Sequence, residues 1–167
     1  RFFADALDRE TAQARRENTP FSIIIMDVDH FKQFNDTYGH KCGDVVLQTL
    51  AKFLSDNTRS SDIVCRYGGA GFVILMPDAA TDSAHDRANF FRSQFEQLHI
   101  EYEGQMLKST FSAGVASFPV HAASGEALLS LADQALYRSK AQGRNRVSIY
   151  SPESQHTDVT DKKKKNL

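Results

Sequence analysis

The spacing of hydrophobic residues changes several times along the chain, and each change predicts a new element. Apolar residues at helical spacing predict a first helix from Phe2, which ends at Asn18-Thr19-Pro20. The continuous apolar run FSIIIMDVD then predicts a strand that is buried on both faces. This strand ends at Asp27-Val28-Asp29, so its carboxylates are expected at the C-terminal mouth of a buried strand.

Two helices and a hairpin are predicted next. The segments HFKQFNDTYG and CGDVVLQTLAKFLSDN both place apolar residues on one helical face. Two β-prone runs, near residues 63–67 and 72–76, flank the turn Gly68-Gly69-Ala70-Gly71 and predict a hairpin. This turn brings the backbone close to its surroundings but carries no side chain that can do acid–base or metal chemistry.

The following segment predicts a helix from about Asp82 to Leu98. Gly104 then separates two β-prone runs, which predicts a strand pair. The second strand of this pair is expected to be long and to extend from Leu107 to Phe118.

A final helix, which Ser124 can cap, should end near Gly143 before the strand RVSIY. Because strands joined by hairpins alternate with helices, the pattern predicts an α+β (mixed α/β) fold. Its central sheet should be largely antiparallel, with about five strands covered by helices. We expect this domain to span residues 1–150.

Residues 151–167 are mostly polar and end in DKKKKNL. We interpret them as a solvated, disordered tail or a remnant of cloning that lies outside the domain. Contact of the lysines with nucleic acid or a membrane is the alternative interpretation.

Composition narrows the function classes only slightly. The 167 residues fit one domain, and 41% hydrophobic and 25% charged residues are ordinary values for a globular protein. The longest apolar run falls well short of the roughly 18 residues that a membrane span needs. The formal net charge of −1 gives no general attraction to nucleic acid or anionic lipid, so we expect neither partner. Phosphate recognition must come from locally placed lysines and arginines.

Cys42 and Cys65 have no cysteine or histidine partner at a zinc-like spacing, which is typical of reduced thiols in the cytoplasm. The opening residues RFFAD lack the pattern of a signal peptide. We therefore expect a cytoplasmic fragment of a larger protein, such as a sensor.

The segment DVDHFKQFNDTYGHKCGD carries the first candidate chemistry. Asp27 can bind Mg²⁺ at the end of a buried strand, because Mg²⁺ prefers one or two carboxylates together with phosphate oxygens. Asp29 can act as a second ligand, or it can cap the helix that starts at His30. Asn35, His40 and Asp44 are polar residues on or between the short helices, where the Asn amide and the Asp carboxylate can pair with a purine edge. Each can instead be a helix cap or a surface residue.

Four segments resemble one family when they are read in this order: DVDHFKQFNDTYGHKCGD, RSSD, RYGGAGF and ADQALYRSKAQGRNRV. They resemble the GGDEF family of bacterial diguanylate cyclases, which make cyclic di-GMP from two molecules of GTP. The resemblance runs from Arg1 to about Tyr150 and implies the fold predicted above. The order and spacing of all four segments make it specific, whereas the Gly-Gly turn alone would be a weak signal.

The resemblance implies roles for several residues. Asp27 would bind Mg²⁺ or Mn²⁺, and Val28 would offer its backbone carbonyl to the same metal. Asn35 and Asp44 would form hydrogen bonds with guanine. The remaining residues expected at the substrate site are Lys32, His40, Gly68, Gly69, Lys140 and Arg144.

Lys140 and Arg144 match the cations that hold the GTP phosphates in the family. Their i,i+4 spacing predicts that both lie on one helical face, where they could share an anion. The alternative is a solvated helix end whose positive charges are favoured by the helix dipole.

Family members catalyse phosphoryl transfer, in which the 3′-hydroxyl of one GTP attacks the α-phosphate of the other. Metal ions between two carboxylates neutralise the developing charge. Because each domain holds one GTP, the resemblance implies a homodimer, and a regulatory domain absent from this sequence would impose it.

The chain departs from the family at the signature turn, which reads Gly68-Gly69-Ala70-Gly71-Phe72. Ala70 stands where the family has its second metal carboxylate and proposed proton acceptor, and Gly71 stands where it has a glutamate. The loss of such groups lowers the rate by a factor on the order of 10³–10⁵. We therefore expect a strongly impaired site, in which Asp29 is the only nearby carboxylate that could compensate.

Arg59 and Asp62, in RSSD, match the RxxD inhibitory site at which the family binds cyclic di-GMP. Arginine can clasp phosphate or a guanine edge with two parallel hydrogen bonds. A surface arginine beside a capping aspartate is the plainer interpretation. The second arginine that some members place on the next helix has no single counterpart, because Arg87 and Arg92 are both near and Phe90 is a third candidate for the aligned position.

Three functions remain open from the sequence. The first is a non-catalytic domain that binds cyclic di-GMP, GTP or both. The second is an active cyclase whose turn is engineered or tolerated, so whether the chain is an enzyme stays undecided. The third is a dimerisation domain without a ligand, which the retained binding residues disfavour.

Overall fold

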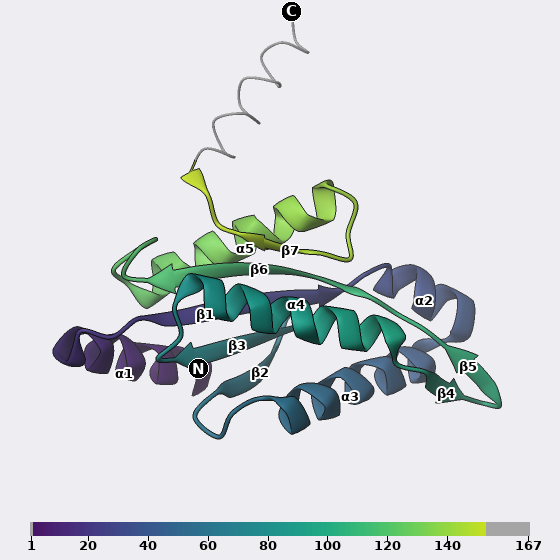
Figure 1. Cartoon of the computed structure of the whole chain (residues 1–167). Coiled ribbons are helices and arrows are strands. Elements are labelled where there is room, and N and C mark those ends of the chain that lie inside the picture. Colours follow the sequence, from purple (N-terminus) through teal and green to yellow (C-terminus); the bar gives the residue numbers. More distant parts are fainter. Residues whose placement is uncertain (1, 153–167) are drawn as a thin grey trace, which may run out of the picture.

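The computed structural model describes residues 2–152 (Figure 1). The predicted tail, residues 151–167, lies outside the described residues apart from Ser151 and Pro152. The elements follow one another as α1 (Phe2–Glu17), β1 (Phe21–Val28), α2 (Phe31–Tyr38), α3 (His40–Asn57), β2 (Ile63–Tyr67), β3 (Gly71–Pro77), α4 (Thr81–Gln97), β4 (Ile100–Tyr102), β5 (Gln105–Leu107), β6 (Phe111–Phe118), α5 (Gly125–Ala141) and β7 (Val147–Ile149).

The main sheet has five strands in the order β2-β3-β1-β6-β7. The pairs β2–β3, β3–β1 and β1–β6 are antiparallel, and only β6–β7 is parallel. The predicted fold class is therefore confirmed. The hairpin β4–β5 forms a separate two-stranded sheet.

Helices cover both faces of the main sheet (Figure 1). Alternate residues of β1 point to opposite faces, as its pleat requires. Ile24 and Met26 pack into a core with residues of α3 and α4, and Ile23 and Ile25 pack into a second core with residues of α1 and α5. Each of these four side chains is at most 1% exposed, which confirms that β1 is buried on both faces.

The predicted long strand from Leu107 to Phe118 is wrong, because it is two strands that belong to different sheets. β5 ends at Leu107 and pairs with β4, whereas β6 begins at Phe111 and pairs with β1. The break falls next to Thr110, whose backbone carbonyl and side-chain hydroxyl both bond to Asp29 at the end of β1. These bonds draw the chain into the main sheet only from Phe111 onward.

A glycine determines how closely α5 lies on the sheet. A Cβ atom at Gly114 of β6 would come within 2.2 Å of the carbonyl oxygen of Ala132 and 2.3 Å of the amide nitrogen of Leu136. The backbone of α5 can therefore rest directly on β6. One helical turn after Leu136, this close packing brings Lys140 to the C-terminal end of β1.

Candidate functional site

A pocket of about 510 Å³ opens at the C-terminal end of β1. Its wall comes from the end of β1, α2, the start of α3, the β2–β3 turn and the C-terminal end of α5. The residues of this wall that the sequence predicts for a nucleotide site are Asp27, Val28, Lys32, Asn35, His40, Ala70, Lys140 and Arg144.

Four other predicted residues lie outside this wall. Asp44 is exposed on the first turns of α3, and Gly68 and Gly69 form the exposed tip of the hairpin. Gly71 is buried at the start of β3.

The structure brings Asp27 and Lys140 into direct contact. Asp27 Oδ2 accepts a hydrogen bond from Lys140 Nζ across 113 positions of sequence. The side chains are 28% and 34% exposed, so the ion pair lies at the pocket mouth rather than in the core. The residue expected to bind metal and the residue expected to bind phosphate therefore bind each other in this structure.

At the strand position that pairs with Asp27, the hairpin has no space for a side chain. Gly71 is the direct partner of Asp27 in the β1–β3 pairing, and Ala70 accepts a 3.0 Å backbone hydrogen bond from Val28. A Cβ atom at position 71 would lie 2.6 Å from the carbonyl oxygen of Met26 and 2.7 Å from that of Tyr67. With the backbone in this conformation, position 71 accepts only glycine.

Asp29 is a buried structural residue, and its predicted role as a helix N-cap is wrong. His30 occupies the N-cap position of α2 with a φ of 56°, and α2 has no side-chain cap. The carboxylate of Asp29 instead accepts hydrogen bonds from Thr110 Oγ1 at 2.7 Å, Ser112 Oγ at 2.6 Å and the amide of Asn145 at 3.0 Å. These donors fix Asp29 to β6 and to the turn after α5.

The residues present do not fit the metal centre that the family resemblance implies. Asp27 is paired with Lys140, Asp29 is occupied by three donors, and positions 70 and 71 offer no carboxylate. Within residues 2–152, no group of three or more His, Cys, Asp or Glu side chains could hold a metal ion. One free carboxylate oxygen and the backbone of Val28 are a poor ligand set for Mg²⁺ without further oxygens.

The prediction that Lys140 and Arg144 share a helical face is wrong. α5 ends at Ala141, and the chain then turns through Gly143 at a φ of 124° and Arg144 at a φ of 65°. Arg144 still reaches the pocket, because its amide bonds to the carbonyl of Ser139 at 3.0 Å and its Nη1 to that of Lys140 at 3.2 Å. The turn, rather than the helix, positions this guanidinium.

The side-chain oxygen of Asn35 is a hydrogen-bond acceptor to which no donor of the described residues is bonded. This oxygen, Oδ1, is buried and has no hydrogen-bond partner in the described part of the chain. Oδ1 lies against Gly43 of α3, where a Cβ atom would come within 1.8 Å of it. Buried polar atoms are nearly always paired in proteins, so this oxygen marks a place for a donor from a ligand or water. Sequence reasoning missed Gly43, although a glycine in an otherwise apolar helical face signals a close contact.

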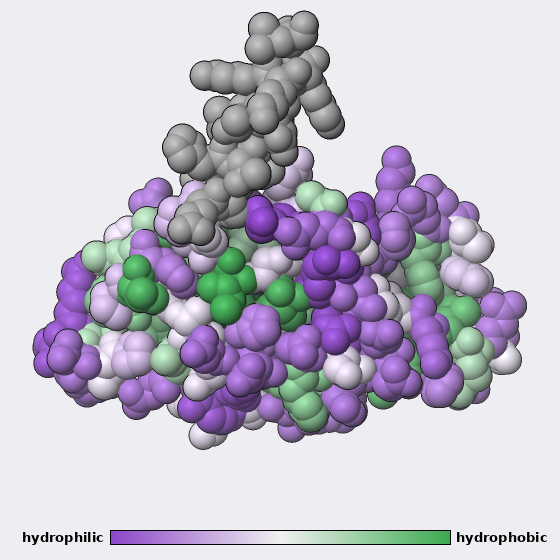
Figure 2. Space-filling model, turned by 45° about the horizontal axis from the view of Figure 1, so that its top comes forward, coloured by the Kyte–Doolittle hydropathy of each residue, from purple (hydrophilic) through white to green (hydrophobic). Residues whose placement is uncertain are grey.

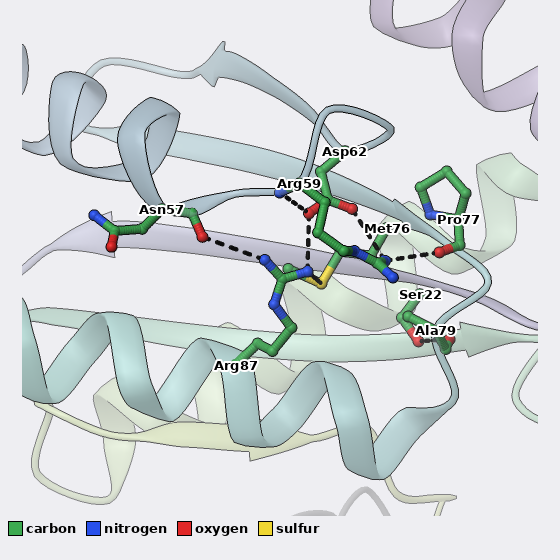
Figure 3. Close-up of polar contacts among 8 residues, drawn as sticks. All are labelled: Ser22, Asn57, Arg59, Asp62, Met76, Pro77, Ala79 and Arg87. Atoms are coloured by element: carbon green, nitrogen blue, oxygen red, sulfur yellow. Dashed lines mark hydrogen bonds and ion pairs between the residues drawn. The ribbon is translucent and has the colours of Figure 1, made fainter.

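The second predicted site forms a compact ionic cluster, which we call the Arg59–Asp62–Arg87 cluster (Figure 3). The Asp62 side chain is 0% exposed and accepts hydrogen bonds from the amide of Arg59 and from Nη1 of Arg87, both at 2.8 Å. Nη2 of Arg59 also contacts Asp62 at 3.2 Å and donates to the carbonyl of Pro77 at 2.8 Å. The Arg59 side chain remains 46% exposed.

The structure distinguishes the two arginines of α4. Arg87 reaches Asp62, as Figure 3 shows, and its guanidinium lies over the ring of Phe91. Arg92 instead donates hydrogen bonds to Glu96 and Asn145, near the pocket at the end of β1. Arg87 is therefore the second arginine of the cluster, and Phe90, one turn away, is 51% exposed.

The pocket and the cluster lie at opposite ends of β3. Gly71 at one end faces Asp27, and Pro77 at the other end accepts the bond from Arg59. Six residue steps at about 3.4 Å each separate the two ends by roughly 20 Å.

Neither cysteine is a candidate nucleophile, and the described residues form no large apolar area on the face shown in Figure 2. On the face shown in Figure 2, hydrophobic residues form small separate areas among polar ones. Burial raises the pKa of the Cys42 and Cys65 thiols, which is the opposite of what activates a nucleophilic cysteine. Within residues 2–152, the helices are too short or too polar to cross a membrane.

Comparisons with known proteins match most of the chain. The family model "Diguanylate cyclase, GGDEF domain" matches residues 1–146. Diguanylate cyclase DosC of Escherichia coli is 40% identical over 151 residues, which cover 90% of this chain and 33% of that protein. The chain thus spans about a third of the length of this curated relative.

Solved structures agree with this match. The GGDEF domain of DgcB from Caulobacter crescentus, solved in complex with c-di-GMP, gives a TM-score of 0.83 at 32% identity and covers 89% of this chain and 88% of that chain. The active GGEEF domain of a diguanylate cyclase from Vibrio cholerae gives 0.82 at 31% identity, with 89% and 94% covered.

The contacts of Asp29 generate a prediction about stability. Asp29→Ala should lower the free energy of unfolding by about 3 kcal/mol, because it leaves three donors without their charged acceptor. Urea unfolding measures this effect. Asp56→Ala is the matched control, because Asp56 forms an exposed pair with Lys52, and the substitution should cost at most about 0.5 kcal/mol. Equal midpoints for both variants would contradict the structural role of Asp29.

Proposed function

Because the chain belongs to the GGDEF family of diguanylate cyclase domains, we propose that it is a non-catalytic guanine-nucleotide-binding module in cyclic di-GMP signalling. In this proposal, the chain binds cyclic di-GMP at the Arg59–Asp62–Arg87 cluster and GTP in the pocket at the end of β1. It would pass its ligand state to an attached domain of a longer, dimeric bacterial protein.

One observation carries the loss of catalysis in this proposal: the strand position opposite Asp27 is a glycine that has no space for a side chain. Phosphoryl transfer needs positive charge between the reacting oxygens, and the second of the two carboxylates that would hold metal ions there, at position 70, is missing. Ala70 cannot accept a proton from a 3′-hydroxyl. Together these losses should lower the rate by a factor on the order of 10³–10⁵.

The cluster supports a role in binding cyclic di-GMP. The ligand carries two phosphodiester groups and two guanine edges, and arginine can bind both kinds of group with parallel hydrogen bonds. Arg59 is half exposed, whereas Asp62 is fully covered by the two arginines. A ligand would therefore engage Arg59 by turning its guanidinium away from Pro77, while Arg87 keeps Asp62 paired.

The first pocket supports binding of a guanine base. Guanine presents two adjacent N–H donors, and the unpartnered Oδ1 of Asn35 is a buried acceptor at the pocket wall. Asp44, one residue after Gly43, would accept the second donor. Lys32, His40 and Arg144 also line the pocket and are available for the phosphates.

The proposal predicts that the protein does not make cyclic di-GMP from GTP with Mg²⁺ or Mn²⁺. Product is measured by chromatography, with the Vibrio cholerae GGEEF domain at the same concentration as the active control. Formation of product at the rate of that control would show that the turn is tolerated and that the chain is an active cyclase. Ala70→Glu with Gly71→Glu should not restore the control's rate, because position 71 has no room for a side chain.

The proposal also predicts that the exposed arginine controls binding of cyclic di-GMP. Arg59→Ala should weaken binding at least about tenfold in calorimetric titrations, because it removes a bidentate donor to the ligand. Arg66→Ala is the control, since Arg66 lies on β2 and its guanidinium donates to the hairpin carbonyl of Gly69 instead. Equal affinities in all three proteins, or binding in none of them, would remove the cluster as the cyclic di-GMP site.

A third prediction separates guanine recognition from folding. Gly43→Ala should displace the flexible end of Asn35 and weaken GTP binding about tenfold in calorimetric titrations. Its free energy of unfolding should stay the same or rise by about 1 kcal/mol, because alanine is favoured over glycine in helices. Gln48→Ala, at an exposed position of α3, should change neither quantity. Unchanged GTP affinity in Gly43→Ala would exclude Asn35 from the base site.

A further inference from the structure

The ion pair at the pocket mouth leads to an inference about metal ions. We propose that Asp27 is the counter-ion of Lys140 and not a metal ligand, so that GTP in this pocket is held without a divalent cation bound to the protein. This inference rests on the proposed nucleotide pocket and concerns how the same site neutralises phosphate.

The first argument is the surroundings of Asp27. Its Oδ2 contacts the Lys140 ammonium, and both side chains are about one-third exposed. Because it is in direct contact with Asp27, the Lys140 ammonium already supplies the positive charge that a bound cation would supply. A metal ion would have to displace Lys140 and would then find no second carboxylate, because the hairpin offers only Ala70 and Gly71 and Asp29 is occupied by its three donors.

The second argument is the position of Lys140. The close approach of α5 to Gly114 fixes the last turn of the helix on the sheet, so Lys140 reaches Asp27 from a rigid support. Arg144 follows in a turn that is held to the same region through Asn145 and Asp29. A lysine ammonium can hold a carboxylate and a phosphate oxygen at the same time, because it has three donors.

The third argument is the charge balance of the pocket. Three basic side chains, Lys32, Lys140 and Arg144, and three acidic ones, Asp27, Asp29 and Asp36, line its wall. Removal of the Asp27 charge leaves a net positive wall and frees Lys140 for phosphate. If Asp27 held a metal ion, the same change would instead remove the metal and its attraction for the triphosphate. The two roles of Asp27 therefore predict effects of opposite sign.

The test is calorimetric titration of the full chain with GTP, once with Mg²⁺ and once with EDTA. The wild-type affinities in the two buffers should agree within about threefold. Asp27→Asn should bind GTP about three- to tenfold more tightly in both buffers, because a nearby like charge has been removed. Weaker binding of Asp27→Asn in the Mg²⁺ buffer, or wild-type binding that EDTA abolishes, would overturn the inference while leaving nucleotide binding intact.

Two controls complete the experiment. Asp36→Asn removes another wall carboxylate, which has no lysine contact within residues 2–152, so its gain in affinity should be smaller than that of Asp27→Asn. An equal gain would overturn the role of the Lys140 pair. Mn²⁺ is also titrated without nucleotide and followed by electron paramagnetic resonance. No binding is expected, and Mn²⁺ binding that Asp27→Asn abolishes would overturn the inference even if GTP did not bind. Absence of GTP binding in both buffers would instead refute the proposed nucleotide pocket.

Discussion

The buried carboxylate of Asp29 is the interaction on which the geometry of the candidate site depends. A buried charge costs several kcal/mol unless donors surround it. Here the donors come from Thr110, Ser112 and Asn145, so the end of β1, the start of β6 and the turn after α5 must meet at one point. The break between β5 and β6 and the position of Arg144 both follow from this requirement. The pocket wall is thus organised by a residue whose carboxylate is occupied by donors of the protein.

Local sequence patterns were sufficient to predict most of the fold. The buried strand β1, the Gly-Gly hairpin and the Ser124 cap, whose Oγ accepts from the amide of Ala127, follow from residues near one another in sequence. The role of Asp29 could not be predicted in this way, because its partners lie 81, 83 and 116 positions away. A capping aspartate and a buried one look alike in sequence, and only the contacts made after folding distinguish them.

For the candidate site too, the sequence predicted which residues belong to it but not the contacts between distant ones. The family resemblance predicted the residues of a nucleotide site, and eight of these predicted residues line one pocket. It did not reveal the pairing of Asp27 with Lys140, because that contact joins distant elements through the close packing of α5 at Gly114. Nor did it choose between Arg87 and Arg92, which depends on the direction in which each side chain leaves α4. The loss of catalysis, the cyclic di-GMP site and the use of metal stay predictions.

The backbone around Gly71 bears on how such a domain can change over evolutionary time. Two carbonyl oxygens, those of Met26 and Tyr67, lie within 2.7 Å of the place that a Cβ atom of residue 71 would occupy. A mutation to any larger residue meets those oxygens first. Mutation of Gly71 to a larger residue therefore requires compensating changes in the hairpin backbone. A glycine at this position is thus easier to acquire than to reverse.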